Sequence, residues 1–115
     1  MRNFRELVAW QVAFDVAKRI YQLTEDFPKT EVFGLTSQMR RSAVSIASNL
    51  AEGAGRSTKR DFAQFVTVAR GSLNELQTQY LLAQELGFCV DDEEIASLIE
   101  RLYGLINGLR NSLNA

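Results

Sequence analysis

Apolar side chains recur every three or four residues along almost the whole chain, and a single proline, Pro28, interrupts them. Positions with this spacing share one face of an α-helix. A proline ends or kinks a helix, because it has no backbone N–H and its ring restricts the preceding residue. The sequence therefore predicts an all-α protein whose first helix ends near Pro28.

Local start and stop signals divide the apolar pattern into four helices. Thr36 is a candidate N-cap after Gly34, and Thr58 begins a capping arrangement with Asp61. Gly87 is typical of the residue that follows a helix. Within one domain, 1–115, the predicted helices span about residues 3–27, 36–54, 58–86 and 92–113. Short connections between such helices predict an antiparallel up-down-up-down four-helix bundle.

Several glycines and one acidic run have predicted structural roles in this bundle. Gly53 and Gly55 are predicted to end the second helix, and the acidic run 91–94 to begin the fourth. Gly71 lies inside the third helix, where glycine costs about 1 kcal/mol relative to alanine. Close approach of another helix explains that cost, and the same holds for Gly104 and Gly108 in the fourth helix.

The residue inventory argues against an enzyme. The 115 residues include no histidine and one cysteine, Cys89. Glu-x-x-His di-metal sites and Cys/His zinc sites are therefore not expected, and no serine has a histidine base. A hard-cation site at the acidic run 91–94 is the alternative to a helix cap there. We expect no catalytic residue, no metal and no cofactor. One cysteine, no long apolar run and a charged N-terminal region also predict a cytoplasmic protein without a membrane span.

A second, polar stripe follows the second helix at helical spacing. Its side chains are mostly short hydroxyls and amides, and the third helix supplies possible partners, with Arg41 and Glu75 as a conceivable charge-assisted pair. We interpret the set as a structural polar network or a subunit contact, with a ligand site as the alternative. The residues are Gln38, Arg41, Ser45, Asn49, Glu52, Ser72 and Glu75.

Charge is distributed unevenly although the net charge is only −1. Residues 1–70 carry a net charge of +4 and residues 71–115 a net charge of −5. Opposite charges in the two halves permit pairing between helices or head-to-tail self-association. The candidate nucleic-acid contacts are Arg40, Arg41, Arg56, Lys59, Arg60 and Arg70. Those at residues 56–60 would meet a phosphate at the positive end of the third helix, although a solvated loop has the same composition.

Two segments resemble a known family. The stretch QMRRSAVSIASNLAEG at 38–53 and the stretch ARGSLNEL at 69–76 are similar to the signatures of 23S rRNA intervening sequence proteins. Trp10 and the pattern from Pro28 to Leu35 also match. Ala47 stands where the family often has proline, and Gln77 where glutamate is common.

The resemblance implies an up-down bundle that assembles as a ring-like homopentamer without catalytic residues. It also implies a relation to accessory proteins of diversity-generating retroelements, which bind nucleic acid and a reverse transcriptase. The expected function is that of a non-enzymatic, homo-oligomeric module associated with RNA or a ribonucleoprotein. Its expected partners are other copies of the chain and RNA or a nucleic-acid-processing protein. The alternative is a protein-interaction scaffold with no nucleic-acid ligand.

Overall fold

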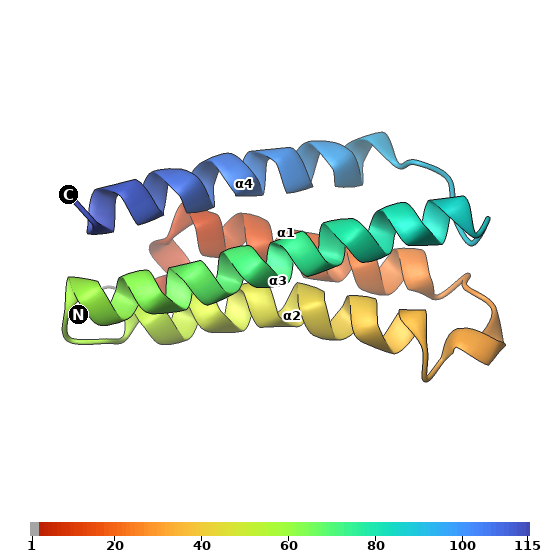
Figure 1. The fold of residues 1–115 in the computed structure, drawn as a ribbon, viewed down its shortest axis with the longest axis horizontal. Helices are drawn as coiled ribbons and strands as arrows, with labels where there is room; N and C mark the ends of the chain where they lie inside the picture. Colours follow the sequence, from red (N-terminus) through yellow and green to blue (C-terminus); the bar gives the residue numbers. More distant parts are fainter. Residues whose placement is uncertain (1–2) are drawn as a thin grey trace.

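A computed structural model describes residues 3–115, which form four α-helices, two short 3-10 turns and no strand. The all-α prediction with four helices is confirmed. All four helices run along the longest dimension of a body that measures 43 × 24 × 20 Å (Figure 1). The elements are η1 (Phe4–Glu6), α1 (Val8–Thr24), η2 (Lys29–Glu31), α2 (Leu35–Ala54), α3 (Lys59–Glu85) and α4 (Glu93–Leu113).

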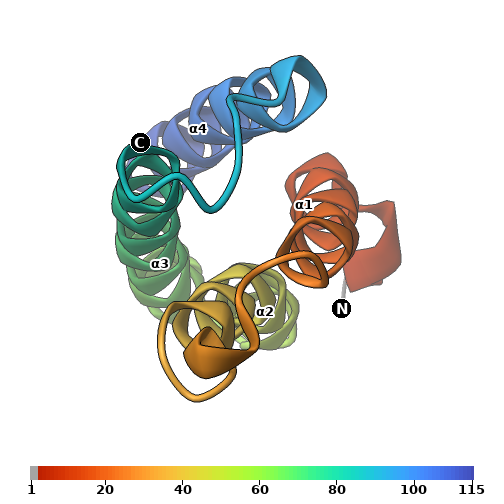
Figure 2. The same ribbon diagram turned by 90° about the vertical axis from the view of Figure 1, so that its right-hand side faces the viewer.

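The helices follow one another around a common centre, and each contacts two neighbours (Figure 2). The α1–α2 and α3–α4 connections lie at one end of the body, and the α2–α3 connection lies at the other end with the C-terminus (Figure 1). Contact is most extensive between α2 and α3 and thinnest between α1 and α4. A hollow of about 1150 Å³ lies between α1 and the start of α4, and an ion pair between Arg19 and Glu94 joins the same two helices.

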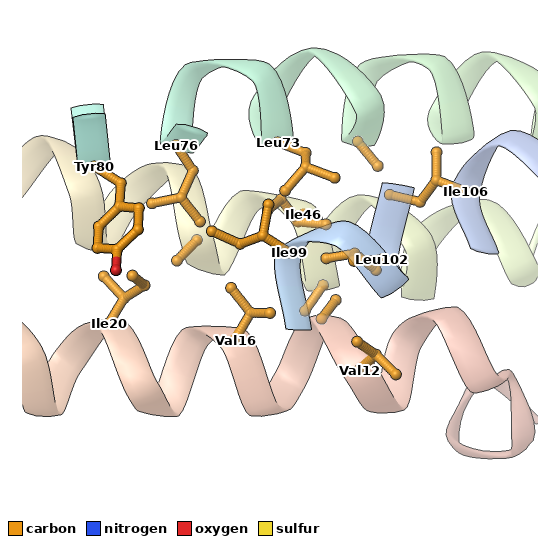
Figure 3. Packing of buried hydrophobic residues seen from close by; sticks show 14 of the residues in the cluster. Val12, Val16, Ile20, Ile46, Leu73, Leu76, Tyr80, Ile99, Leu102 and Ile106 are labelled. Carbon is orange, nitrogen blue, oxygen red and sulfur yellow. The ribbon is translucent and has the colours of Figure 1, made fainter. Parts of the chain in front are cut away.

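Branched aliphatic side chains from all four helices meet in the centre (Figure 3). On α1 they recur every fourth residue, which is the spacing that the sequence predicts for a buried face. Full burial of one such side chain contributes about 1.5–3 kcal/mol relative to exposure. The fully buried members include Val16, Ile20, Ile46, Leu73, Leu76, Leu102 and Ile106.

The first helix is shorter than the predicted span 3–27. Leu7 has an extended backbone and separates η1 from α1, and α1 ends at Thr24. The Thr24 hydroxyl donates a hydrogen bond to the Ile20 carbonyl oxygen at 2.7 Å. Phe27 is buried in the core, where the centre of its ring lies 5.6 Å from the centre of the Phe88 ring. The chain thus leaves the helix three residues earlier than the proline requires.

The start of the second helix also differs from the prediction. Gly34, not Thr36, is the N-cap residue, and Thr36 is buried inside the first turn of α2. A side chain from the preceding turn does the capping, because Glu31 Oε1 accepts a hydrogen bond from the backbone nitrogen of Leu35 at 3.0 Å. The prediction placed the N-cap two residues too late because the capping side chain, Glu31, lies outside α2.

Gly53 does not end α2, because the helix continues through Ala54. A Cβ atom at position 53 would lie 2.7 Å from Phe65 Cβ and 2.9 Å from the Phe62 ring on α3. Such distances are shorter than real Cβ contacts, so glycine is required for the close approach of α2 and α3 at this point. Gly55 is the C-cap residue, as the sequence suggested.

The other three helix glycines have the opposite environment. A Cβ atom at Gly71, Gly104 or Gly108 would meet nothing within 4 Å in this chain. The prediction that they allow close helix approach is therefore wrong for the packing within one bundle. Within one bundle, no close contact of a neighbouring helix at these positions offsets the lower helix propensity of glycine.

Predicted boundaries of the third helix agree closely with the structure. Thr58 is the N-cap of α3, with its hydroxyl oxygen accepting from the backbone nitrogen of Asp61 at 3.1 Å. Gly87 follows α3 with a φ of 76°, a conformation that glycine adopts without a steric cost. At α4 the N-cap is Asp92, whose Oδ1 accepts from the backbone nitrogens of Glu94 and Ile95. Among residues 3–115, no helix is long and apolar enough to cross a membrane.

Candidate functional site

The α2–α3 connection brings three basic side chains together. Arg56, Lys59 and Arg60 are all exposed, and they flank the Thr58 cap at the beginning of α3. The first turn of a helix carries backbone N–H groups without an intrahelical partner and a partial positive charge. Cationic side chains, a hydroxyl and a helix N-terminus are thus concentrated at this end of the body (Figure 1).

Arg56 has protein partners at this junction. Its guanidinium lies 3.3 Å from Glu52 Oε1, one helical turn earlier, and 4.7 Å from the centre of the Phe65 ring. Both members of the ion pair are largely exposed, and such pairs contribute little to stability. The Glu52 carboxylate therefore offsets part of the positive charge of Arg56 without fixing it firmly.

Lys59 and Arg60 form no ion pair within residues 3–115. They line a hollow of about 600 Å³ with Gln64 and Thr67 on α3 and the last residues of the chain after α4. The hollow combines two cations with an amide and a hydroxyl, which are the groups that contact phosphate oxygens in protein–nucleic acid complexes.

Arg40 lies toward the opposite end of the molecule and is engaged with α1. Its Nε donates to Thr24 Oγ1 at 2.8 Å, and its terminal nitrogen donates to the Tyr21 carbonyl oxygen at 3.3 Å. The guanidinium also lies 4.5 Å from the centre of the Tyr21 ring. Arg40 thus satisfies groups at the last turn of α1, where helix carbonyls have no intrahelical partner.

Arg70 is engaged as well, in the middle of α3. Its Nε donates to Asn107 Oδ1 on α4 at 2.9 Å, and nearby the Tyr103 hydroxyl donates to Asn74 Oδ1 at 2.7 Å. Burial raises the pKa of the Tyr103 hydroxyl, against an opposing effect of the Arg70 charge. These contacts join α3 to α4. The six basic residues therefore lie in three separate places, with Arg41 beside Arg40, and do not form one patch.

The polar stripe on α2 is divided between the helix interface and solvent. Ser45 Oγ lies 2.9 Å from Ser72 Oγ across the α2–α3 interface, and the Asn49 amide donates to the carbonyl oxygen of Ser45 at 2.8 Å and to its hydroxyl at 3.0 Å. Ser72 is buried, and Ser45 and Asn49 are half-buried. The structure thus brings together three of the residues that the sequence grouped.

The charged and larger members of that stripe stay on the surface. Gln38, Arg41, Glu52 and Glu75 are exposed. Arg41 and Glu75 line one hollow of about 320 Å³ but form no ion pair within residues 3–115. The conceivable Arg41–Glu75 pair is therefore not made, because both side chains remain in solvent above the serine pair.

Tyr80 has a role that the sequence did not reveal. It occupies a core position on α3, and its hydroxyl accepts from the backbone nitrogen of Asp92 at 2.6 Å and donates to Asp91 Oδ1 at 3.2 Å. Burial is the main reason that the pKa of Tyr80 is raised to about 12. The only signal in the sequence was an aromatic residue with a polar tip in an otherwise apolar stripe.

Groups with catalytic potential are sparse among residues 3–115. No cluster of three histidine, cysteine, aspartate or glutamate side chains is arranged to hold a metal ion. Burial raises the pKa of the half-buried Cys89 thiol, which lowers the fraction of the reactive thiolate. The exposed cations and the helix N-terminus at the α2–α3 connection are groups that can bind an anion.

Comparisons with known proteins agree with this architecture. A family model described as 23S rRNA-intervening sequence protein matches residues 5–111. A solved structure of a protein with unknown function from the S23 ribosomal protein family of Bacteroides thetaiotaomicron is similar, with a TM-score of 0.63 and 19% sequence identity. The similarity covers 91% of this chain and 94% of that one. A comparison with curated proteins finds no significant match.

Proposed function

We propose, from the premise that this chain belongs to the 23S rRNA-intervening sequence protein family, that it is a non-enzymatic module associated with RNA. In this proposal the α2–α3 connection contacts the phosphate backbone. Contacts of this kind provide affinity without sequence specificity and depend strongly on salt. The natural complex is an RNA or a ribonucleoprotein in the cytoplasm.

One observation carries the choice of this site. Lys59 and Arg60 are exposed cations without a carboxylate partner among residues 3–115, and they share a hollow with Gln64 and Thr67. By contrast, Arg40 and Arg70 donate hydrogen bonds to groups of the same chain. A phosphate would have to compete with those groups, so Lys59 and Arg60 are the preferred contacts, and Arg56 beside them would first have to leave the Glu52 carboxylate.

Self-assembly is the second part of the proposal. The unit is an up-down-up-down bundle of antiparallel neighbours, which is supported by the alternating ends of the connections in Figure 1. The assembly is a ring-like homopentamer, as the family resemblance implies. A ring would place several copies of the basic connection on one surface, and multiple sites on one RNA raise the overall affinity.

A specific feature also favours a second function, that of a protein-interaction scaffold. Phe33, in the α1–α2 connection, is 96% exposed, and Val90, in the α3–α4 connection, is 83% exposed. Both connections lie at the same end of the body (Figure 1). Large apolar side chains at one end suit contact with a partner protein rather than with phosphate.

Fluorescence anisotropy with structured and single-stranded RNA at about 50 and about 200 mM salt tests the main proposal. We expect binding that weakens steeply as salt increases. The Lys59→Ala/Arg60→Ala variant should bind more weakly, with a salt slope reduced by about 0.9 for each lost contact with a duplex phosphate. Lys18→Ala, which removes an exposed cation from α1, is the matched control and should bind as the wild type does.

Two results would count against the RNA proposal. Absence of binding at low salt removes RNA as a ligand of the isolated protein and favours the scaffold. A salt slope that is the same in the Lys59→Ala/Arg60→Ala variant and the wild type removes the α2–α3 connection as the contact. A pull-down that enriches one protein and is insensitive to nuclease would support the scaffold directly.

A further inference from the structure

A partly apolar groove follows the junction between the end of α1 and the beginning of α2. Its volume is about 520 Å³. Tyr21, Val32 and Val44 contribute apolar surface and are each about half exposed. Thr36, Ser37 and Ser45 contribute hydroxyl groups, and Arg40 and Arg41 complete the lining.

The lining of this groove carries positive charge, and the nearest carboxylate that shares a hollow with it is Glu75, which lies beside Arg41 in a neighbouring hollow. No carboxylate is among its lining residues. The three partners of Arg40 are a hydroxyl, a carbonyl and an aromatic ring, none of which is negatively charged. Arg41 forms no ion pair within residues 3–115. The groove thus presents two guanidinium groups beside apolar surface.

A second hollow, between α3 and α4, has the opposite charge. It holds about 430 Å³, and its lining includes the carboxylates of Asp91 and Glu100 but neither lysine nor arginine. Leu81, which is about half exposed, supplies apolar surface there. The half of the chain that forms this hollow, residues 71–115, carries a net charge of −5.

Within one copy the basic groove and the acidic hollow cannot contact each other, but the groove of one copy can contact the hollow of another. The α1–α2 and α3–α4 junctions are on opposite sides of the body (Figure 2), and α2 does not contact α4. Both hollows, however, lie toward the same end, because the helix segments that line them adjoin the α1–α2 and α3–α4 connections (Figure 1). A second copy lying alongside, with its long axis parallel, would therefore bring the acidic hollow level with the basic groove.

We propose that the α1–α2 groove of one copy binds the α3–α4 face of a second copy, with Arg41 opposite Glu100. This inference rests on the self-assembly part of the proposed function and names the two surfaces that make it. Different surfaces meet in such a contact, so it is heterologous, and heterologous contacts close into rings when the rotation between copies allows it. Close approach of a neighbouring copy along α4 also gives a reason for Gly104 and Gly108, whose positions face open space in a single chain.

Sedimentation velocity of the full chain without RNA, over a range of protein concentrations, tests this pairing. The wild type should self-associate. Arg41→Glu alone, and Glu100→Lys alone, should each weaken association by about tenfold or more, because each places like charges opposite one another. The variant carrying both changes should recover most of the association, because it restores opposite charges. Lys18→Glu and Glu25→Lys reverse exposed charges outside both hollows and should associate as the wild type does.

Circular dichroism of each variant checks that its helices are intact before the comparison is made. A wild type that stays monomeric at every concentration overturns both self-assembly and this pairing, while leaving the RNA contact to its own test. Single reversals that associate as tightly as the controls overturn the pairing alone. If the variant with both changes associates more weakly than either single variant, the pairing is also overturned, because Arg41 and Glu100 then do not face each other.

Discussion

The phenolic oxygen of Tyr80 lies 2.6 Å from the backbone nitrogen of Asp92, the residue that caps α4. A buried side chain of α3 therefore accepts a hydrogen bond from Asp92, the residue that immediately precedes α4. Tyr80 is 2% exposed and Asp92 is half-buried, so the contact lies at the edge of the core. The α3–α4 connection is fixed at its end by this contact and at its beginning by the Gly87 turn.

Tyr80→Phe should lower the free energy of unfolding by about 1–3 kcal/mol, because the Asp92 N–H loses its acceptor. Urea denaturation followed by circular dichroism measures the change. Asp91→Asn is the matched control, since it keeps the Tyr80–Asp92 contact and should have a smaller effect. A Tyr80→Phe protein as stable as the wild type would show that the hydroxyl contributes nothing to holding the connection.

The raised pKa of Tyr80 gives a pH dependence with a defined sign. The folded-state value of about 12 exceeds the ordinary value of 10.0, so the folded state holds the phenolic proton more tightly than the unfolded chain does. This contribution is fully present below pH 10 and is lost as the pH rises toward 12. Urea midpoints between pH 9 and 11 should fall more steeply in the wild type than in Tyr80→Phe. Parallel pH profiles would contradict the assignment.

Gly53→Ala should destabilise the protein by about 1–3 kcal/mol, although alanine is the better helix former. The added methyl would lie 2.7 Å from Phe65 Cβ, so α2 and α3 must separate locally. Gly71→Ala is the control, because a methyl at that position meets nothing within 4 Å and should stabilise the helix by up to about 1 kcal/mol. Thermal and urea unfolding of both variants should give shifts of opposite sign.

The hydroxyl pair between Ser45 and Ser72 predicts a non-additive double mutant. Ser45→Ala leaves the buried Ser72 hydroxyl without its partner and should cost about 1 kcal/mol, whereas Ser72→Ala should cost less because the Ser45 hydroxyl keeps its bond from Asn49. Removing both hydroxyls leaves fewer unsatisfied groups, so the double variant should cost less than the sum of the two. Urea unfolding of the four proteins completes the cycle. Simple additivity would mean that the 2.9 Å contact carries no coupling.

Arg40→Lys separates a structural role from a role in binding RNA. Lysine keeps the charge but loses the two directed hydrogen bonds to Thr24 and Tyr21 and the contact of the guanidinium with the Tyr21 ring. We expect stability to fall by about 1 kcal/mol and RNA affinity to stay at the wild-type value. Anisotropy and urea unfolding supply the two measurements. Lower RNA affinity with unchanged stability would reverse the interpretation.

Much of the fold was predictable because the signals are local. The caps at Thr58 and Gly87 depend on residues within one or two turns, and both were correctly placed. Thr36 was misplaced as a cap because the group that caps α2 is the Glu31 side chain, which comes from the preceding turn. At the end of α1 a distant residue also takes part, because Arg40, sixteen residues further along the chain, donates a hydrogen bond to Thr24.

The candidate site was predictable only as a set of residue types. The sequence grouped six basic residues by proximity along the chain. In the structure Arg40 and Arg70 are occupied by partners 16 and 37 residues away, whereas Lys59 and Arg60 are without an ion pair in the described residues. No local pattern distinguishes an arginine that caps a neighbouring helix from one that faces solvent.

By itself the sequence determined that the chain forms four amphipathic helices, because apolar spacing and capping act between residues a few positions apart. Only the tertiary structure decided which role each of two residues of the same type has within a helix. Gly53 and Gly71 are the same residue inside helices, yet one is required by the Phe62 and Phe65 side chains and the other faces open space. Likewise, two arginines of the basic half and two carboxylates of the acidic half line separate hollows. Helix packing sets these outcomes, since it joins residues that are far apart in the chain.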